Sequence, residues 1–80
     1  MQKFEQTELK NLQPGDRFYF CGDKKKQIYT LASEKTFFTL KQKNWTKHYA
    51  SCISDNNPKV SEPHLQERRV IFLRNINQKI

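Results

Sequence analysis

The sequence predicts a single all-β domain, and three observations lead to this fold class. Aromatic and β-branched residues occur in short runs instead of at helical spacing. Polar residues that favour tight turns separate these runs. Only 35% of the 80 residues are hydrophobic, so we expect one small domain over residues 1–80, with a thin core and no buried catalytic cavity.

No part of the sequence has the pattern of a membrane span or a secretion signal. No apolar run approaches the roughly 20 residues that cross a bilayer. The first ten residues are polar and lack the apolar centre of a signal peptide. We therefore expect a cytoplasmic protein with no membrane partner.

The first predicted strand follows a turn at Pro14-Gly15-Asp16, where proline fixes one φ angle and glycine permits a positive one. The strand covers residues 17–21, and its alternation places Phe18 and Phe20 on one face. These two rings are the first predicted core residues. Gly22-Asp23 and three consecutive lysines then predict a hairpin tip in solvent.

Three further strands are predicted in the middle of the chain, separated by polar breaks at Glu34-Lys35 and Lys43-Asn44. Each combines aromatic or aliphatic residues with polar neighbours. They cover residues 27–33, with Tyr29 and Leu31 on one face, residues 36–41, with Phe37, Phe38 and Leu40, and residues 47–53, with Tyr49 and Ile53.

The last third of the chain predicts a long loop followed by a strand. Residues 54–66 contain two prolines and few apolar residues, which is typical of a surface loop. Such a loop is either mobile or a contact loop, and mobility is favoured. Residues 68–75 have the strongest strand pattern, with apolar side chains on both faces, so we expect a central or closing strand buried on both sides. Residues 77–80 are expected to fray.

Five short strands joined by tight turns match the small barrels of the SH3-like or OB type. The segment Leu9-Lys10-Asn11-Leu12-Gln13-Pro14-Gly15-Asp16-Arg17-Phe18 resembles the start of many SH3-like barrels. It also resembles small uncharacterised bacterial and phage proteins, whose closing strand is similar to residues 70–74. The resemblance implies a five-stranded SH3-like barrel, and it carries no active-site residues to this chain.

The chain lacks the patterns of metal or catalytic sites. Cys21 and Cys52 are too few for a disulfide framework, and we interpret both as reduced thiols, with a disulfide as the alternative. His48 and His64 lack the paired close spacing of zinc ligands and are expected in loops or at the surface. We expect no metal, no cofactor and no enzymatic activity. The carboxylates are expected in turns and loops, and they include Asp16, Asp23, Asp55, Glu62 and Glu67.

The most suggestive feature is the placement of charge. The formal net charge is +7, and residues 41–80 carry +5 of it, with eight basic residues against three acidic ones. Between Glu34 and Asp55 no residue is acidic, and lysines alternate with aromatic residues. Lysines neutralise phosphates, and an exposed aromatic ring stacks on a base, so this pattern is typical of a single-stranded nucleic-acid platform. If the strands are continuous, one face holds Lys41, Lys43, Trp45, Lys47 and Tyr49.

Each of these residues also has a more ordinary interpretation. In a thin core, Trp45 and Tyr49 are expected to be partly buried, because large apolar groups supply most of the available stability. The lysines also serve solubility, since a charge of this size is ordinary for a small domain. Lysines at a hairpin tip and arginines beside a strand also protect sheet edges.

The leading hypothesis is a non-catalytic module that binds nucleic acid with low sequence specificity. The alternative is a protein-interaction module that docks on an acidic partner through a strand edge or through residues 54–66. A third hypothesis is a homodimer formed through an exposed strand. The residues expected to bind nucleic acid are Arg17, Lys24, Lys25, Lys26, Lys41, Lys43, Trp45, Lys47, Tyr49 and Arg68.

Overall fold

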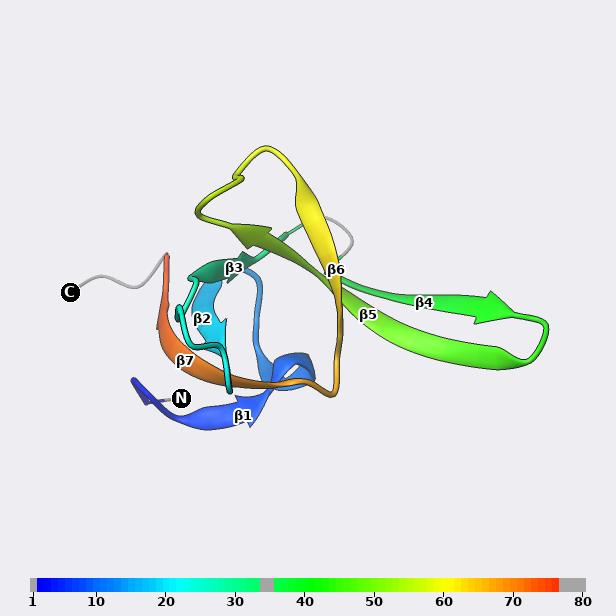
Figure 1. Ribbon diagram of the computed structural model, residues 1–80, viewed down its shortest axis with the longest axis horizontal. Helices are drawn as coiled ribbons and strands as arrows, with labels where there is room; N and C mark the ends of the chain where they lie inside the picture. The colour runs from blue at the N-terminus through cyan, green and yellow to red at the C-terminus, as the bar shows by residue number, and fades with distance from the viewer. Residues whose placement is uncertain (1, 34–35, 77–80) are drawn as a thin grey trace.

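The computed structural model describes residues 2–33 and 36–76, and these residues form one antiparallel sheet of seven strands (Figure 1). The strand order is β1-β7-β2-β3-β5-β4, and β6 pairs with β5 off this path. This confirms the all-β prediction. The strands are β1 (Gln6–Glu8), β2 (Asp16–Phe20), β3 (Tyr29–Leu31), β4 (Phe37–Gln42), β5 (Trp45–Ser54), β6 (Ser61–Leu65) and β7 (Arg69–Asn75), and a short 3-10 helix, η1 (Leu9–Asn11), follows β1.

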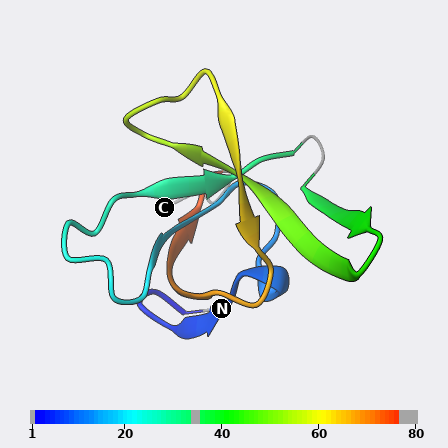
Figure 2. The ribbon, with the colours of Figure 1, turned by 45° about the vertical axis from the view of Figure 1, so that its right-hand side comes forward.

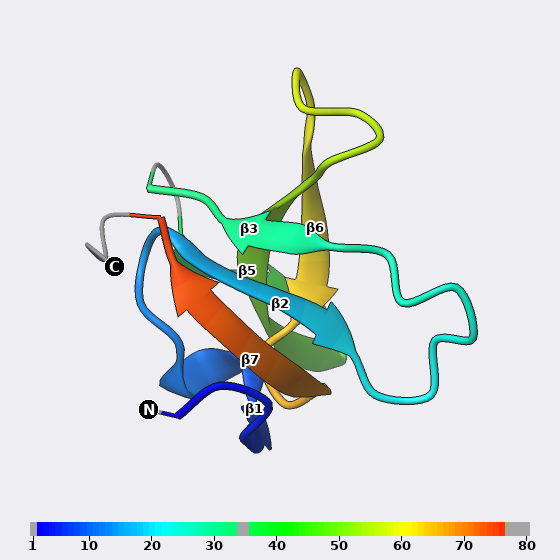
Figure 3. The ribbon, with the colours of Figure 1, turned by 90° about the vertical axis from the view of Figure 1, so that its left-hand side faces the viewer.

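The sheet is strongly curved, but its strand pairing is open. Figure 3 shows β7, β2 and β3 side by side, with β5 and β6 curling behind them. Among the described residues, pairing runs from β1 to β4 without returning to its start. The sequence predicted five strands, whereas the described residues form seven, because β1 and β6 were not recognised in the sequence.

The core lies inside the curve of the sheet. Phe18 and Phe20 are 0% and 3% exposed, as their alternation in β2 predicted, and their rings meet edge to face with centroids 5.4 Å apart. Tyr29 packs against both rings. The whole buried cluster comprises Leu9, Leu12, Phe18, Phe20, Tyr29, Leu31, Ala50, Cys52, Val70 and Phe72.

The turn before β2 is linked by hydrogen bonds to β3 and to β7. Gly15 has a φ of +88°, and its N–H donates to the Leu31 carbonyl. The Asp16 carboxylate accepts hydrogen bonds from the Gln13 N–H, at 2.7 Å, and from the Asn75 side-chain amide, at 2.8 Å. The predicted turn is confirmed, and its carboxylate joins β2 to β7.

The predicted loop at residues 54–66 is wrong over its second half. Residues 61–65 form β6, which pairs with β5 in a register that sets Pro63 opposite Ser51. A proline lacks the N–H that an inner strand needs, so the sequence argued against a strand here. In the described part of the chain β6 pairs with β5 alone, so the proline is tolerated. The mobility of the remaining loop stays a prediction.

The last strand, β7, lies between β1 and β2, which confirms its predicted central place. Val70 and Phe72 are buried, whereas Ile71 and Leu73 are half-exposed, so its second face is not covered as expected. The predicted break at Glu34-Lys35 and the predicted frayed tail at residues 77–80 lie outside the described part. In residues 2–33 and 36–76, no helix has the length and apolar character needed to cross a membrane.

The β4–β5 hairpin extends beyond the rest of the sheet as a two-stranded projection (Figure 1). We call residues 38–49 the arm. Here β5 begins at Trp45, two residues earlier than expected, and it continues into the core at Ala50. The projection gives the molecule principal extents of 46 × 24 × 23 Å. The arm therefore offers side chains that the core does not cover.

Candidate nucleic-acid interface

The register of the arm sorts its side chains onto two faces. Residues directly opposite each other in an antiparallel pair share a face. On β5, Ala50 and Cys52 point into the core. The even-numbered arm residues of β5 and the β4 residues opposite them therefore form an inner face. The odd-numbered arm residues of β5 and the β4 residues opposite them form an outer face. The outer face holds Phe38, Leu40, Gln42, Trp45, Lys47 and Tyr49, and the inner face holds Thr39, Lys41, Thr46 and His48.

The prediction that five residues share one face is wrong for Lys41. The two-residue turn at Lys43 and Asn44 reverses the chain, and the register sets Lys41 opposite Thr46 on the inner face. Lys43 lies in the turn itself. The prediction holds for Trp45, Lys47 and Tyr49, which alternate along a single strand.

Trp45 is exposed, so its predicted core packing is wrong. Its side chain lies at the tip of the arm, far along β5 from the buried cluster, and 42% of its surface is accessible. The Lys47 ammonium lies 5.8 Å from the centre of the indole ring, within the range of a cation–π contact. An accessible indole beside a cation is suited to stacking on a base.

Tyr49 lies at the base of the arm and is half-buried, in agreement with the interpretation of partial burial. Its ring stacks on Phe38, with centroids 5.7 Å apart and an interplanar angle of 23°. Leu65 of β6 lies opposite Tyr49 on the other side of β5. Sequence analysis did not assign Phe38, Leu40 and Leu65 to this surface. The turn at residues 43–44 was predicted, and the opposite pairs counted from it would have identified Phe38 and Leu40.

The charge on the arm has one sign. Lys41, Lys43 and Lys47 are exposed, and residues 36–54 include no acidic residue. Glu67, from the β6–β7 turn, places a carboxylate beside the arm, where it lines a hollow with Thr46, Lys47, His48 and Leu65. The charges carried by the arm itself are all positive.

The other predicted basic residues lie apart from the arm. Arg17 on β2 forms an ion pair with Asp55, at 2.5 Å. The Arg68 guanidinium lies 4.0 Å from the centre of the Phe20 ring, at the edge of the core. Lys24, Lys25 and Lys26 are exposed at the β2–β3 hairpin tip, which confirms the tip, but Figure 2 shows that tip on the opposite side of the body from the arm.

His64 is not the surface or loop residue that the sequence suggested. It lies on β6 with its ring against Phe20 and Tyr29, at centroid distances of 4.7 and 5.4 Å. Arg68 can only donate, so its contact of 3.4 Å with Nδ1 requires that nitrogen to accept. The Nε2 atom is buried and 3.6 Å from a Glu62 oxygen, which is too long for a hydrogen bond. Burial, aided by the Arg68 charge, lowers the pKa of His64, although Glu62 opposes this.

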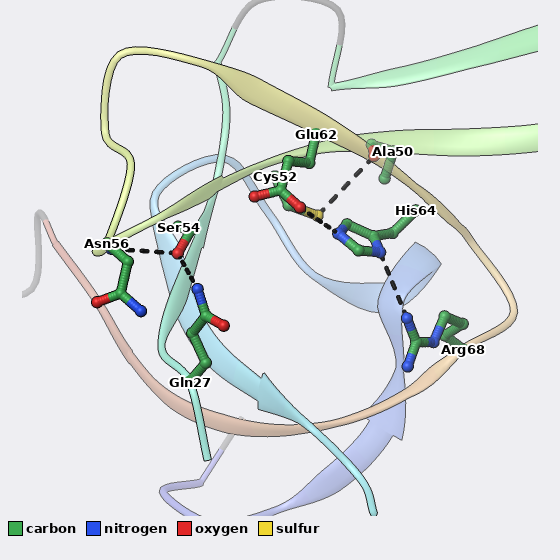
Figure 4. Close-up of polar contacts among 8 residues, drawn as sticks. All are labelled: Gln27, Ala50, Cys52, Ser54, Asn56, Glu62, His64 and Arg68. Atoms are coloured by element: carbon green, nitrogen blue, oxygen red, sulfur yellow. Dashed lines mark hydrogen bonds and ion pairs between the residues drawn. The ribbon is translucent and has the colours of Figure 1, made fainter. Parts of the chain in front are cut away.

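The two cysteines are free thiols, as expected. Burial raises the pKa of Cys52 to about 12, and its sulfur lies 3.8 Å from the Ala50 carbonyl oxygen (Figure 4). The thiol therefore stays protonated at neutral pH and is a poor nucleophile. In the part of the chain that the structure describes, no three His, Cys, Asp or Glu residues are grouped so that they could hold a metal ion.

Comparison of this chain with protein-family models, with curated proteins and with solved structures found no match. The function proposed below therefore rests on the residues of the chain itself.

Proposed function

We propose that this protein is a non-catalytic module that binds nucleic acid through the arm, with low sequence specificity. One observation carries the proposal. The arm projects from the body with exposed lysines, an exposed tryptophan and no acidic residue. Lysines that contact phosphates release counterions, which favours binding to any nucleic-acid sequence. Aromatic stacking is also tolerant of sequence, because every base has a π-face.

We further propose that five of the strands correspond to an SH3-like barrel. The strands β7, β2, β3, β5 and β6 are antiparallel neighbours in this order. The N–H groups of Leu9 and Lys10 donate to the carbonyls of Arg68 and Gln66, so the N-terminal segment lies along the turn between β6 and β7. On this proposal, β1 and β4 are additions to the five-stranded unit.

The test is the fluorescence anisotropy of labelled single-stranded DNA, RNA and duplex DNA at low salt and at physiological salt of about 0.15 M. We expect binding that weakens steeply as salt rises. The informative variant carries Lys41→Glu, Lys43→Glu and Lys47→Glu. Its matched control carries Lys24→Glu, Lys25→Glu and Lys26→Glu, which changes the net charge equally at the other side of the molecule.

If the arm contacts the ligand, the arm variant loses binding and the control keeps most of it. Equal losses of affinity in the two variants would show that binding depends on the net charge and not on the arm. No binding of any probe by the wild-type protein at low salt would refute the proposal.

The runner-up function is docking on an acidic protein, and two observations favour it. Among the described residues β4 pairs with β5 alone, so its other edge is available for a further strand. Phe37 and Leu40 on β4 are 43% and 45% exposed. If no nucleic acid binds, retention of the protein on a polyglutamate matrix, lost in the arm variant, would favour this function.

A further inference from the structure

We infer that the nucleic acid bound by the arm is single-stranded and lies along the outer face, with unstacked bases against Trp45 and Tyr49 and a phosphate at Lys47. This inference rests on the proposed function and specifies its ligand. It also separates the two lysines of the arm strands, because Lys47 lies on the outer face and Lys41 on the inner face.

The spacing along β5 favours an unstacked strand. Trp45 and Tyr49 are four residues apart on one face, with Lys47 between them. At roughly 3.3 Å per residue, the two aromatic positions are about 13 Å apart. Stacked bases in a duplex are about 3.4 Å apart, so adjacent stacked bases cannot reach both rings. A single strand can separate its bases and place its backbone beside the lysine between them.

The character of the outer face also favours bases over phosphates. Leu40 lies opposite Lys47, Phe38 stacks on Tyr49, and Leu65 continues the apolar surface on β6. Phosphates laid against these side chains would lose hydration without gaining partners. The faces of unpaired bases are apolar and lose little there. A surface of rings and aliphatic side chains with one central cation therefore matches a single strand.

Duplex DNA is the competing ligand, because a two-stranded β-ribbon fits a major groove about 12 Å wide. A ribbon in the groove reads base edges with polar side chains, and the polar face of the arm is the inner one. On that face, however, the Thr39 hydroxyl and the His48 Nδ1 are 3.0 Å apart and satisfy each other. Glu67 lines one hollow with Lys47 and Leu65 of the outer face as well as with Thr46 and His48, so its carboxylate does not distinguish the two faces. The outer face is the better site.

The experiment compares matched variants on the two faces. Lys47→Glu and Lys41→Glu make the same charge change on opposite faces of the arm. Trp45→Ala and Phe37→Ala each remove an aromatic ring of nearly equal exposure, 42% and 43%, and Phe37 has the parity of the inner face. The probes are a short oligothymidylate, an oligouridylate of the same length and a duplex of that length, titrated at low salt.

We expect the single strands to bind more tightly than the duplex. Loss of one stacking contact corresponds to at least about a fivefold drop in affinity. Trp45→Ala should show such a drop, Lys47→Glu should weaken binding at least as much, and Phe37→Ala and Lys41→Glu should each lower affinity by less than the matched change on the outer face. The fluorescence of Trp45, the single tryptophan of the chain, should be quenched by the single strands in the unmodified protein. This readout does not depend on the folding of any variant.

Three outcomes would overturn the inference and leave the proposed function intact, and the first two concern affinity. One is tighter binding of the duplex, and the other is equal weakening by Lys41→Glu and Lys47→Glu. Binding of single strands without quenching of Trp45 would also overturn it. Absence of binding to all three probes would refute the proposed function itself. The relative affinities for the oligothymidylate and the oligouridylate show whether the protein prefers single-stranded DNA or RNA.

Discussion

At the scale of single residues, the structure depends on a few positions where chemistry and geometry are tightly constrained. Alternation in the sequence predicted the burial of Phe18 and Phe20, because side chains on a strand point to opposite faces in turn. Alternation could not predict the burial of His64. The neighbouring prolines concealed its strand, and its ring packs against residues that lie far away in the sequence.

The two glycines allow a matched test of crowding. Gly15 and Gly22 both have positive φ angles, +88° and +84°. A Cβ atom on Gly15 would lie 3.0 Å from a side-chain atom of Ile76, whereas one on Gly22 would have no neighbour within 4 Å. We expect Gly22→Ala to lower the free energy of unfolding by about 1 kcal/mol through backbone strain, and Gly15→Ala by more. Urea denaturation measures both, and equal losses would contradict the role of crowding.

His64 predicts a pH dependence of stability. Burial keeps the pKa of His64 in the folded protein below its ordinary value of 6.5. As the pH falls through 6.5, the unfolded chain therefore binds a proton before the folded one does, and stability is lost. The full contribution is present above this value. We expect the urea midpoint to fall as the pH drops below 6.5, and to fall less in His64→Gln.

The control for this prediction is His48→Gln, which changes an exposed histidine on the arm. The variant removes an exposed imidazole, and a loss of pH dependence equal to that in His64→Gln would contradict the role of the buried ring. An unchanged pH dependence in His64→Gln would show that another group is responsible.

The different environments of the two thiols predict different rates of alkylation. Cys52 is fully buried, and burial raises its pKa to about 12, so its reactive thiolate is scarce at neutral pH. Cys21 is partly exposed at the end of β2. We expect iodoacetamide to modify one thiol of the native protein rapidly and both thiols in denaturant. Mass spectrometry of Cys21→Ser should then find almost no rapid modification, and rapid modification of this variant would contradict the burial of Cys52.

At the scale of elements, the strands of the arm could be predicted from the sequence, but its two faces and the strand β6 could not. Its strands and turn were predicted from runs of aromatic residues and from Lys43-Asn44. Its faces were not, because a two-residue turn changes which residues share a side, and parity counted through the turn gives the wrong face for Lys41. The strand β6 was missed for a different reason. An edge strand accepts prolines that an inner strand would exclude.

The arm should open more readily than the rest of the sheet. A two-stranded ribbon in water is marginally stable, and within residues 2–33 and 36–76 a third strand lies beside the base of the arm alone. We expect backbone amides of the arm to exchange with deuterium at least about tenfold faster than those of residues 50–54 and β7. Hydrogen exchange followed by NMR measures this. Residues 50–54 are an internal control, because they belong to the same strand, β5. Equal protection along β5 would contradict the prediction.

At the scale of the whole molecule, the charges are divided between separate surfaces. The arm and the β2–β3 hairpin tip both carry clustered lysines, on opposite sides of the body. Composition predicted a basic protein, but it could not predict this division. The position of each lysine depends on the path of the whole chain, as does the open pairing of the sheet.

The net charge of +7 predicts that salt affects folding and binding in opposite directions. Like charges repel one another in the compact state, so screening should raise the unfolding temperature by a few degrees from low to physiological salt. The same screening should weaken nucleic-acid binding. Thermal unfolding followed by circular dichroism measures the first effect. The variant with Lys24, Lys25 and Lys26 changed to glutamate has a formal charge of +1, and an unfolding temperature as salt-dependent as that of the wild type would contradict this explanation.

The two-residue turn at the tip restricts how the length of the arm can change. Adding one residue to each strand between the base and the tip would rotate the tip by half a period and exchange its two faces, so that Trp45 would point inward. Adding two residues to each strand would preserve both faces and move the indole farther from the body. The reach of the arm is therefore adjustable in steps of two residues per strand, with no change in the core that anchors it.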